Sequence, residues 1–205
     1  MLEIIVAYYE NSDYKNPISL FPDANIILYD KSNENNCDLS GELVTIKKSE
    51  NIGREGETYL RHIIECYYTL HEYTLFIQDD TNNHIIDELD FHRITNDAIN
   101  NKIPFHHYAS SWKTGWAAYQ RTIYNGYCQL ETFPYPISIL ETCIKFNISL
   151  PKVYTTETCS FLLIHSDRIR QRPIEFYKQL KDWLLEDEKH GYVLEHIWCL
   201  IFAPI

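Results

Sequence analysis

Two adjacent carboxylates stand where an apolar strand is predicted to end. Residues 74–78 (TLFIQ) are followed directly by Asp79 and Asp80. In open α/β sheets, ligands bind beyond the carboxyl ends of the strands, so this pair lies where a ligand is expected. A hard cation such as Mg²⁺ or Mn²⁺ takes oxygen ligands and keeps waters or substrate phosphate oxygens. The pair therefore indicates a metal site that faces a diphosphate, and a solvated turn or helix cap is the alternative.

An arginine stands at the beginning of a predicted helix in the segment ENIGREGETYLRHII (50–64). A helix N-terminus favours anions, and the guanidinium of Arg54 would add a fork of donors for phosphate. Asn51 is expected to cap this helix. The alternative is an ordinary capped helix in which Arg54 pairs with Glu57 or Asp79.

Glu195 interrupts the apolar segment YVLEHIWCLIF (192–202). An acid in surroundings of low dielectric tends towards a raised pKa and can accept a proton from a substrate. The alternative places Glu195 on the polar, solvated side of a helix.

Aromatic side chains cluster in the middle of the chain, where SSWKTGWAAY carries Trp112, Trp116 and Tyr119, and Tyr124 follows. Sugars stack on aromatic faces, so these residues could form a wall for a carbohydrate acceptor. The alternative is that they pack beneath a loop.

The first part of the chain alternates strands with a helix. Short apolar runs rich in β-branched and aromatic residues predict buried strands, and a 3.6-residue apolar spacing from Tyr59 predicts an amphipathic helix. The expected strands are 3–9, 24–31, 42–48 and 74–78, and the expected helix is 54–70. This alternation predicts an α/β sheet with parallel strands.

The second part is expected to add further strands and helices. Residues 85–101 predict one or two short helices, 132–146 a helix begun by proline, 151–157 and 159–165 strands, and 192–202 a closing helix. Residues 166–187 predict a helix that Ser166 caps and that Pro173 divides.

Composition limits the classes of function. The 205 residues carry 29 acidic side chains against 18 Lys and Arg, a formal net charge of −11. Affinity for nucleic acid rests largely on basic residues that neutralise phosphates, so a duplex-binding surface is not expected. Apolar runs stay short of the ~20 residues of a membrane span, and Glu3 interrupts a signal-like start. We expect one soluble, intracellular domain in the cytoplasm, or in the host cytoplasm if a virus encodes it.

Three segments carry a resemblance to a known family. Residues 51–80, 159–184 and 193–202 resemble, in order and spacing, an uncharacterised fungal and viral family. Its pattern is N-x-G-R-E…YL…F-x-Q, then R-P-x-x-FY, then LE-x-x-W-x-x-IF. That family resembles nucleotide-sugar glycosyltransferases of the GT-A type, including small domains with which large DNA viruses glycosylate their capsids. The segment N-x-G-R-E is similar to N-x-G-R-D of rhamnan-type transferases.

The resemblance implies a single GT-A-like, Rossmann-like domain with a central mixed, mostly parallel sheet flanked by helices. Residues 1–80 would form the nucleotide-binding half and 81–205 the acceptor-binding half. The implied activity is transfer of a sugar from a nucleoside diphosphate, with UDP expected, to a glycan or glycoprotein. Asp79 and Asp80 occupy the place of the metal-binding D-x-D motif, although here the acids are adjacent and Thr81 stands where the second would fall.

The resemblance also implies roles at the donor site. Tyr8, Tyr9 and Glu10 end the first strand, where such enzymes cradle the nucleoside. Arg54 would approach the donor diphosphate or brace Asp79.

The metal and the proton acceptor follow from the same resemblance. Asp80, with or without Asp79, would bind Mn²⁺ or Mg²⁺, and His84 is a possible third ligand. In inverting transferases a carboxylate near the beginning of a late helix deprotonates the acceptor. Glu195 is in that relative position, and Glu157 is the second candidate.

Two other functions stay open. The first is a non-catalytic nucleotide- or carbohydrate-binding domain that kept the fold without a complete D-x-D motif. The second is a metal-dependent phosphohydrolase that uses Asp79, Asp80 and His84.

Overall fold

The computed structural model describes most of the chain. The described residues are 1–10, 14–32, 41–81, 85, 87–108, 120–126, 139–157 and 160–202.

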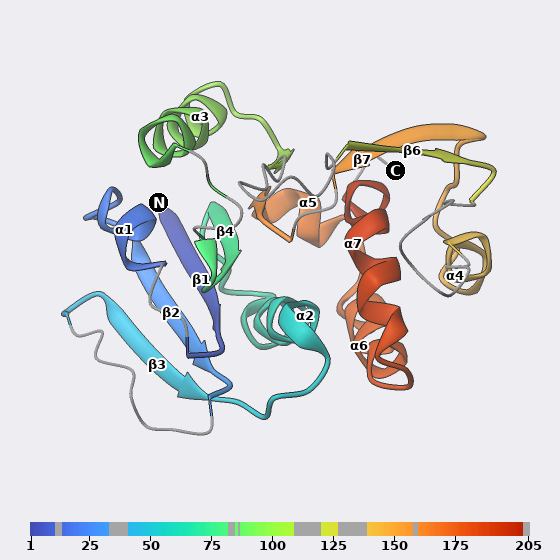
Figure 1. The fold of residues 1–205 in the computed structure, drawn as a ribbon, viewed down its shortest axis with the longest axis horizontal. Coiled ribbons are helices and arrows are strands. Elements are labelled where there is room, and N and C mark those ends of the chain that lie inside the picture. The colour runs from blue at the N-terminus through green and yellow to red at the C-terminus, as the bar shows by residue number, and fades with distance from the viewer. Residues whose placement is uncertain are drawn as a thin grey trace.

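A six-stranded mixed sheet forms the centre of the structure, in the order β3-β2-β1-β4-β8-β5 (Figure 1). Its strands are β1 (Leu2–Tyr8), β2 (Asn25–Asp30), β3 (Val44–Lys48), β4 (Tyr73–Gln78), β5 (Phe105–His107) and β8 (Leu162–His165). The first four run parallel, whereas β8 is antiparallel to both β4 and β5. The predicted α/β class and the shared sheet of the four early strands are confirmed.

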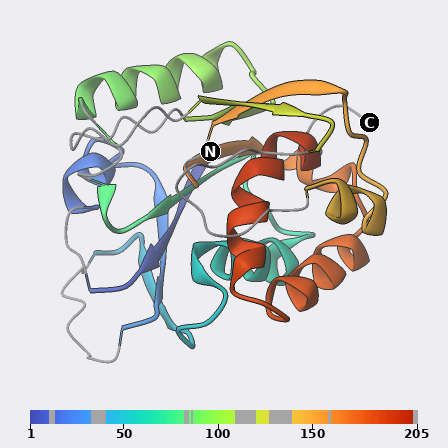
Figure 2. The same cartoon turned by 45° about the vertical axis from the view of Figure 1, so that its right-hand side comes forward.

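Alternation along β1 builds a core on each face of the sheet. Ile5 and Ala7 point to one face, and Ile4 and Val6 point to the other, all without exposed surface. The first face is covered by α2 (Arg54–Cys66), α6 (Ile174–Leu184) and α7 (Lys189–Ile201), and the second by α1 (Lys15–Ser19) and α3 (Glu88–Asn100). Figure 2 shows α2 and α3 on opposite sides of the sheet. Because both faces are covered, the strands read as continuous apolar runs.

Helix α2 places its apolar stripe on the sheet. Tyr59, Leu60 and Ile63 are buried there, which confirms the predicted helix, although it ends at Cys66 and not at residue 70. The prediction that Asn51 caps the helix is wrong. Gly53 occupies the N-cap position in a left-handed conformation, with no side-chain cap.

Helix boundaries in the second half follow local signals. Within the predicted segment 85–101 there is one helix, α3 (Glu88–Asn100), and the Asp87 carboxylate accepts the N–H groups of Leu89 and Asp90 in its first turn. Pro173 separates α5 (Ser166–Arg170) from α6, as predicted. The predicted Ser166 cap is wrong, because His165 Nδ1 accepts the N–H of Asp167 at 3.1 Å and Ser166 is already helical.

The remaining elements form a second layer beside α7. β6 (Gln120–Tyr124) and β7 (Val153–Glu157) pair antiparallel in a separate two-stranded sheet, and α4 (Ile139–Lys145) lies against α7. Strands β5 and β8 come from the second half of the chain yet join the sheet of the first, so both halves share one core. Within the described ranges, no helix is long and apolar enough to cross a membrane.

Candidate functional site

A pocket of about 710 Å³ opens at the carboxyl ends of β1 and β4. The chain proceeds from β1 outwards to β2 and β3, and α2 then returns it to β4 on the other side of β1. Such a reversal of strand order leaves a crevice in which α/β proteins bind ligands. The pocket is lined by Tyr9, Asn51, Ile52, Gly53, Arg54, Glu55, Gln78, Asp79, Asp80, Leu184, Leu185 and Glu188.

The adjacent acids have different environments. Asp79 is 3% exposed, and its Oδ2 accepts the backbone N–H of Tyr9 at 2.6 Å. The backbone of Asp79 also donates to the carbonyl of Ala7 and accepts from the N–H of Tyr14, so this residue ties the end of β4 to the chain that follows β1. Asp80 is partly exposed and lines the pocket. Of the two carboxylates, Asp80 is therefore the one that a ligand can readily reach.

The charge of the pocket lining favours a cation. Glu55, Asp79, Asp80 and Glu188 oppose the single positive charge of Arg54, a formal sum of −3 (four negative, one positive). A diphosphate would be repelled by this lining unless a cation accompanied it. One or two carboxylates completed by substrate phosphate oxygens are a common way to hold Mg²⁺ or Mn²⁺, and Asp80 with Asp79 fits that donor set.

A self-sufficient metal site is not found in the described part of the chain. No group of three or more His, Cys, Asp and Glu side chains there could hold an ion. His84, the predicted third ligand, lies outside the described residues. A cation on the acidic pair would need further ligands, and within the described residues these are left to the oxygens of a substrate.

The guanidinium of Arg54 lies between two carboxylates. Its Nη2 is 3.4 Å from Oε1 of Glu195, and its Nε is 3.6 Å from Oε2 of Glu55. Its Cζ lies 4.4 Å from the ring centroid of Tyr192, a cation–π contact. Burial disfavours the charged guanidinium, but Glu55 and then Glu195 outweigh burial and raise the pKa of Arg54. Two predicted site residues from distant parts of the chain are thus in contact.

The alternative pairing of Arg54 with Glu57 is wrong, because Lys31 and Arg61 pair with Glu57 and Arg54 pairs with Glu55 and Glu195. The buried Nζ of Lys31 lies 3.2 Å from Oε2 of Glu57, and Arg61 pairs with the other oxygen at 2.7 Å. The same Nζ donates to the carbonyls of Ile52 and Arg54 at 2.7 and 2.8 Å. Lys31 therefore holds the backbone of the segment that carries Arg54.

The backbone around Arg54 is locally strained. Gly53 and Arg54 both have left-handed conformations, with φ of 63° and 55°. A residue with a side chain adopts this conformation at a cost of roughly 1–2 kcal/mol. Gly191 of α7 makes room for the arginine, since a Cβ there would lie 3.0 Å from Cδ of Arg54. Lys31 and Gly191, which we did not predict, therefore help to place Arg54 at the pocket.

The three residues predicted to cradle a nucleoside take different places. Tyr9 lines the pocket, and its buried hydroxyl has no hydrogen-bond partner in the described part of the chain. Burial, and then the carboxylate of Glu55, raise the pKa of Tyr9. Tyr8 packs edge-on against Tyr14 at 5.7 Å in the core of the opposite face. Glu10 is exposed where the chain turns away after β1, with φ of 96°.

The second candidate base lies beside another part of α7. Glu157 ends β7, and Cys199 of α7 donates to the hydroxyl of its neighbour Thr156 at 3.4 Å. Burial raises the pKa of the Cys199 thiol, and Glu157 adds to the increase.

The predicted aromatic wall is mostly outside the described structure. Trp112, Trp116 and Tyr119 lie outside the described residues. Tyr124 ends β6 and is exposed.

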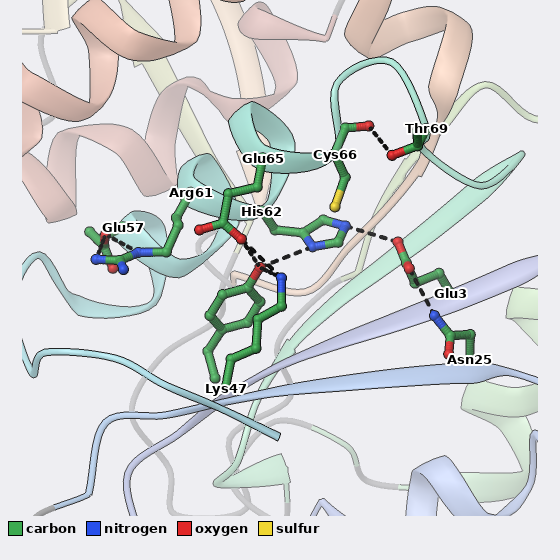
Figure 3. Close-up of polar contacts among 10 residues, drawn as sticks. Glu3, Asn25, Lys47, Glu57, Arg61, His62, Glu65, Cys66 and Thr69 are labelled. Carbon is green, nitrogen blue, oxygen red and sulfur yellow. Dashed lines mark hydrogen bonds and ion pairs between the residues drawn. The ribbon is translucent and has the colours of Figure 1, made fainter. Parts of the chain in front are cut away.

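A buried polar network that we did not predict lies between α2 and the sheet (Figure 3). His62 Nε2 is 2.8 Å from Oε2 of Glu3, and Asn25 donates to the other oxygen of Glu3 at 3.0 Å. Burial favours the neutral form of both ionisable groups. Hydrogen bonds and opposite charge outweigh this effect of burial. His62 lowers the pKa of Glu3, and contacts with Cys66 and Glu3 raise the pKa of His62. Glu3 lies at the beginning of β1, at the opposite end of the strand from the pocket, so this network supports the fold. The available signal was a histidine between Leu60 and Ile63, within a helix that is predicted to pack on the sheet.

A family described as "Protein of unknown function (DUF3431)" matches residues 4–204. The chain belongs to that family. The match includes the strands around the pocket, the beginning of α2 and the whole of α7, so the pocket and the Arg54–Glu195 contact lie within the family domain. A search of curated proteins found no match to the sequence. The match covers nearly the whole chain.

Proposed function

We propose that this protein is a glycosyltransferase that moves a sugar from a nucleoside diphosphate, with UDP expected, to a hydroxyl of a glycan or glycoprotein. The observation that supports this best is the meeting of Asp80, Arg54 and Tyr9 in one pocket at the reversal of strand order. A carboxylate can hold a metal ion, an arginine can bind the diphosphate, and an aromatic ring can contact the nucleoside. Asp80 follows β4, Arg54 begins α2, and Tyr9 follows β1.

The donor would be bound by groups along the pocket wall. A volume of about 710 Å³ suits a small-molecule ligand. The ring of Tyr9 lines the pocket and offers an aromatic surface for the nucleoside. The beginning of α2 and the Arg54 guanidinium favour the diphosphate.

The acidic pair would hold Mn²⁺ or Mg²⁺ together with the diphosphate oxygens. The ion would neutralise the negative charge that collects on the departing nucleoside diphosphate. Asp80 would be the principal ligand, because Asp79 already accepts the N–H of Tyr9.

Glu195 would act as the base. As the acceptor oxygen forms a bond to the anomeric carbon, its proton passes to the carboxylate of Glu195. The bond from that carbon to the phosphate oxygen breaks, and its electron pair leaves on the nucleoside diphosphate. Attack opposite the leaving group inverts the anomeric centre. Glu157 is the second candidate for this role.

The two other functions predict different outcomes. A non-catalytic binding domain would use the same pocket without turnover. A metal-dependent phosphohydrolase would use Asp79, Asp80 and His84, of which His84 lies outside the described residues.

A thermal-shift panel of nucleotide sugars, each with and without Mn²⁺, tests the proposal. A ligand at 100 times its Kd stabilises the folded protein by about 2.7 kcal/mol, which is readily measured. We expect a UDP-sugar to stabilise the protein more in the presence of Mn²⁺, followed by sugar transfer to glycan acceptors. UDP binding without turnover would favour the binding domain. Release of phosphate from simple esters, without UDP affinity, would favour the hydrolase.

A further inference from the structure

The contacts of the Arg54 guanidinium are incomplete. Its distances of 3.4 and 3.6 Å to Glu195 and Glu55 exceed the 2.7–2.9 Å usual for a charge-assisted hydrogen bond. Its Nη1 is buried and lacks a hydrogen-bond partner in the part of the chain that the structure describes. An anion that drew the guanidinium into the neighbouring pocket would supply the partner that Nη1 lacks.

The two carboxylates that flank Arg54 are held differently. Glu55 is 5% exposed, and Ser160 Oγ donates to its Oε1 at 2.8 Å, so its position is fixed from a second side. Glu195 projects from α7, with a side chain that is 15% exposed. Glu55 lines the pocket and Glu195 is not among its lining residues, so a ligand that drew the guanidinium into the pocket would separate it chiefly from Glu195.

The surroundings of Arg54 permit the side chain to move while the backbone stays. The ammonium of Lys31 fixes the carbonyl of Arg54 at 2.8 Å. The side chain beyond it is 40% exposed and passes over the bare Cα of Gly191. Movement about the side-chain torsions alone would then carry the guanidinium between Glu195 and the pocket.

We propose that Glu195 and the diphosphate of the donor compete for Arg54. This inference rests on the proposed function. Without donor, Arg54 stabilises the ionised form of Glu195, which makes that carboxylate a weak base. The diphosphate draws the guanidinium away, and Glu195 becomes a stronger proton acceptor only when a donor is in place. The Arg54–Glu195 pair thus couples donor binding to activation of the base.

A double-mutant cycle on nucleotide affinity tests the competition. Calorimetry would measure binding of UDP with Mn²⁺ to the wild-type protein, Glu195→Gln, Arg54→Gln and the double variant. The amide of Glu195→Gln competes only weakly for the guanidinium, so UDP should bind roughly three- to tenfold more tightly than to the wild type. In the Arg54→Gln background the same substitution should change the affinity little.

Glu188→Gln is the matched control. Glu188 is exposed, lines the pocket from the beginning of α7, and loses the same charge on substitution. Its effect on UDP affinity should be equal in both Arg54 backgrounds, because it reports only the general field of the pocket. Unchanged melting temperatures would show that each variant is folded.

The outcomes separate this inference from the proposed function. Equal effects of Glu195→Gln with and without Arg54, or an unchanged affinity, would overturn the competition alone. Failure of the wild-type protein to bind any nucleoside diphosphate would overturn the proposed function and the competition with it.

Discussion

The guanidinium of Arg54 lies 3.4 Å from the carboxylate of Glu195, although the two residues come from opposite halves of the chain. Arg54 begins α2, and Glu195 lies in the middle of α7. The family resemblance implies a donor-binding role for the first and a proton-accepting role for the second. Their contact joins the two residues, so under the proposed function a substitution of Glu195 should alter donor affinity as well as the rate of transfer.

Loss of the Asp80 carboxylate should affect metal-dependent binding, whereas loss of the Asp79 carboxylate should affect stability. Asp80→Ala should abolish the Mn²⁺-dependent tightening of UDP binding and leave stability nearly unchanged, because Asp80 is partly exposed at the pocket. Asp79→Ala should lower the free energy of unfolding by about 1–3 kcal/mol, since the N–H of Tyr9 loses its acceptor. Calorimetry with and without Mn²⁺, together with urea unfolding, measures both effects. If Asp80→Ala responds to Mn²⁺ as the wild type does, the acidic pair is not the metal site.

The base can be identified by comparing two glutamates. Glu195→Gln should reduce the rate of sugar transfer by roughly 10²–10⁴ while UDP still binds, because a positioned general base contributes about that much. Glu157→Gln should reduce the rate of transfer much less. Glu157 lies at the end of β7 near Cys199, whereas Glu195 contacts Arg54 of the pocket lining. Transfer rates at saturating donor decide between them. A nearly normal rate in the Glu195 variant would transfer the role to Glu157.

The left-handed backbone at Arg54 predicts that two substitutions affect UDP binding equally but affect stability differently. Arg54→Gly and Arg54→Ala both remove the guanidinium and should weaken UDP binding equally. Glycine tolerates φ of 55° without strain, whereas alanine does not, so the glycine variant should be more stable by about 1 kcal/mol. Urea unfolding of the two variants measures the difference. Equal stability would mean that the backbone relaxes once the arginine is gone.

The buried pair of His62 and Glu3 predicts a pH-dependent contribution to stability. The pKa of His62 is raised above its ordinary 6.5 in the folded protein, so its contribution is complete below that pH and is lost as pH rises through the folded pKa. The pKa of Glu3 is lowered below its ordinary 4.5, so its contribution is present above that pH and is lost as pH falls through the folded pKa.

The stability advantage of the wild type over His62→Gln should therefore be largest between about pH 4.5 and 6.5. Urea unfolding of both proteins across this range and up to about pH 9 measures the advantage. An advantage that stays constant above pH 6.5 would show that the imidazole is neutral in the folded protein.

Local pattern in the sequence was sufficient to predict most of the secondary structure. Neighbouring residues alone define the apolar runs of β1, β2 and β4 and the 3.6-residue spacing of α2. The observed strands are largely buried, as such apolar runs predict. Pro173 likewise separates α5 from α6, because proline lacks the backbone N–H that a continuous helix would need at that position. Cap positions were less predictable. Gly53, in a left-handed conformation, takes the N-cap position of α2 for which Asn51 was predicted. His165 takes the N-cap position of α5 for which Ser166 was predicted.

The sequence by itself determined an α/β sheet, an acidic pair at the end of β4 and an arginine at the beginning of α2. Only the tertiary structure decided which charges meet. Lys31 follows β2, yet its ammonium occupies Glu57 of α2, and Arg54 is left to Glu55 and to Glu195 of α7. These contacts depend on how β2, α2 and α7 pack, because a charged side chain pairs with whatever partner the fold brings within a few ångströms, at any separation along the chain.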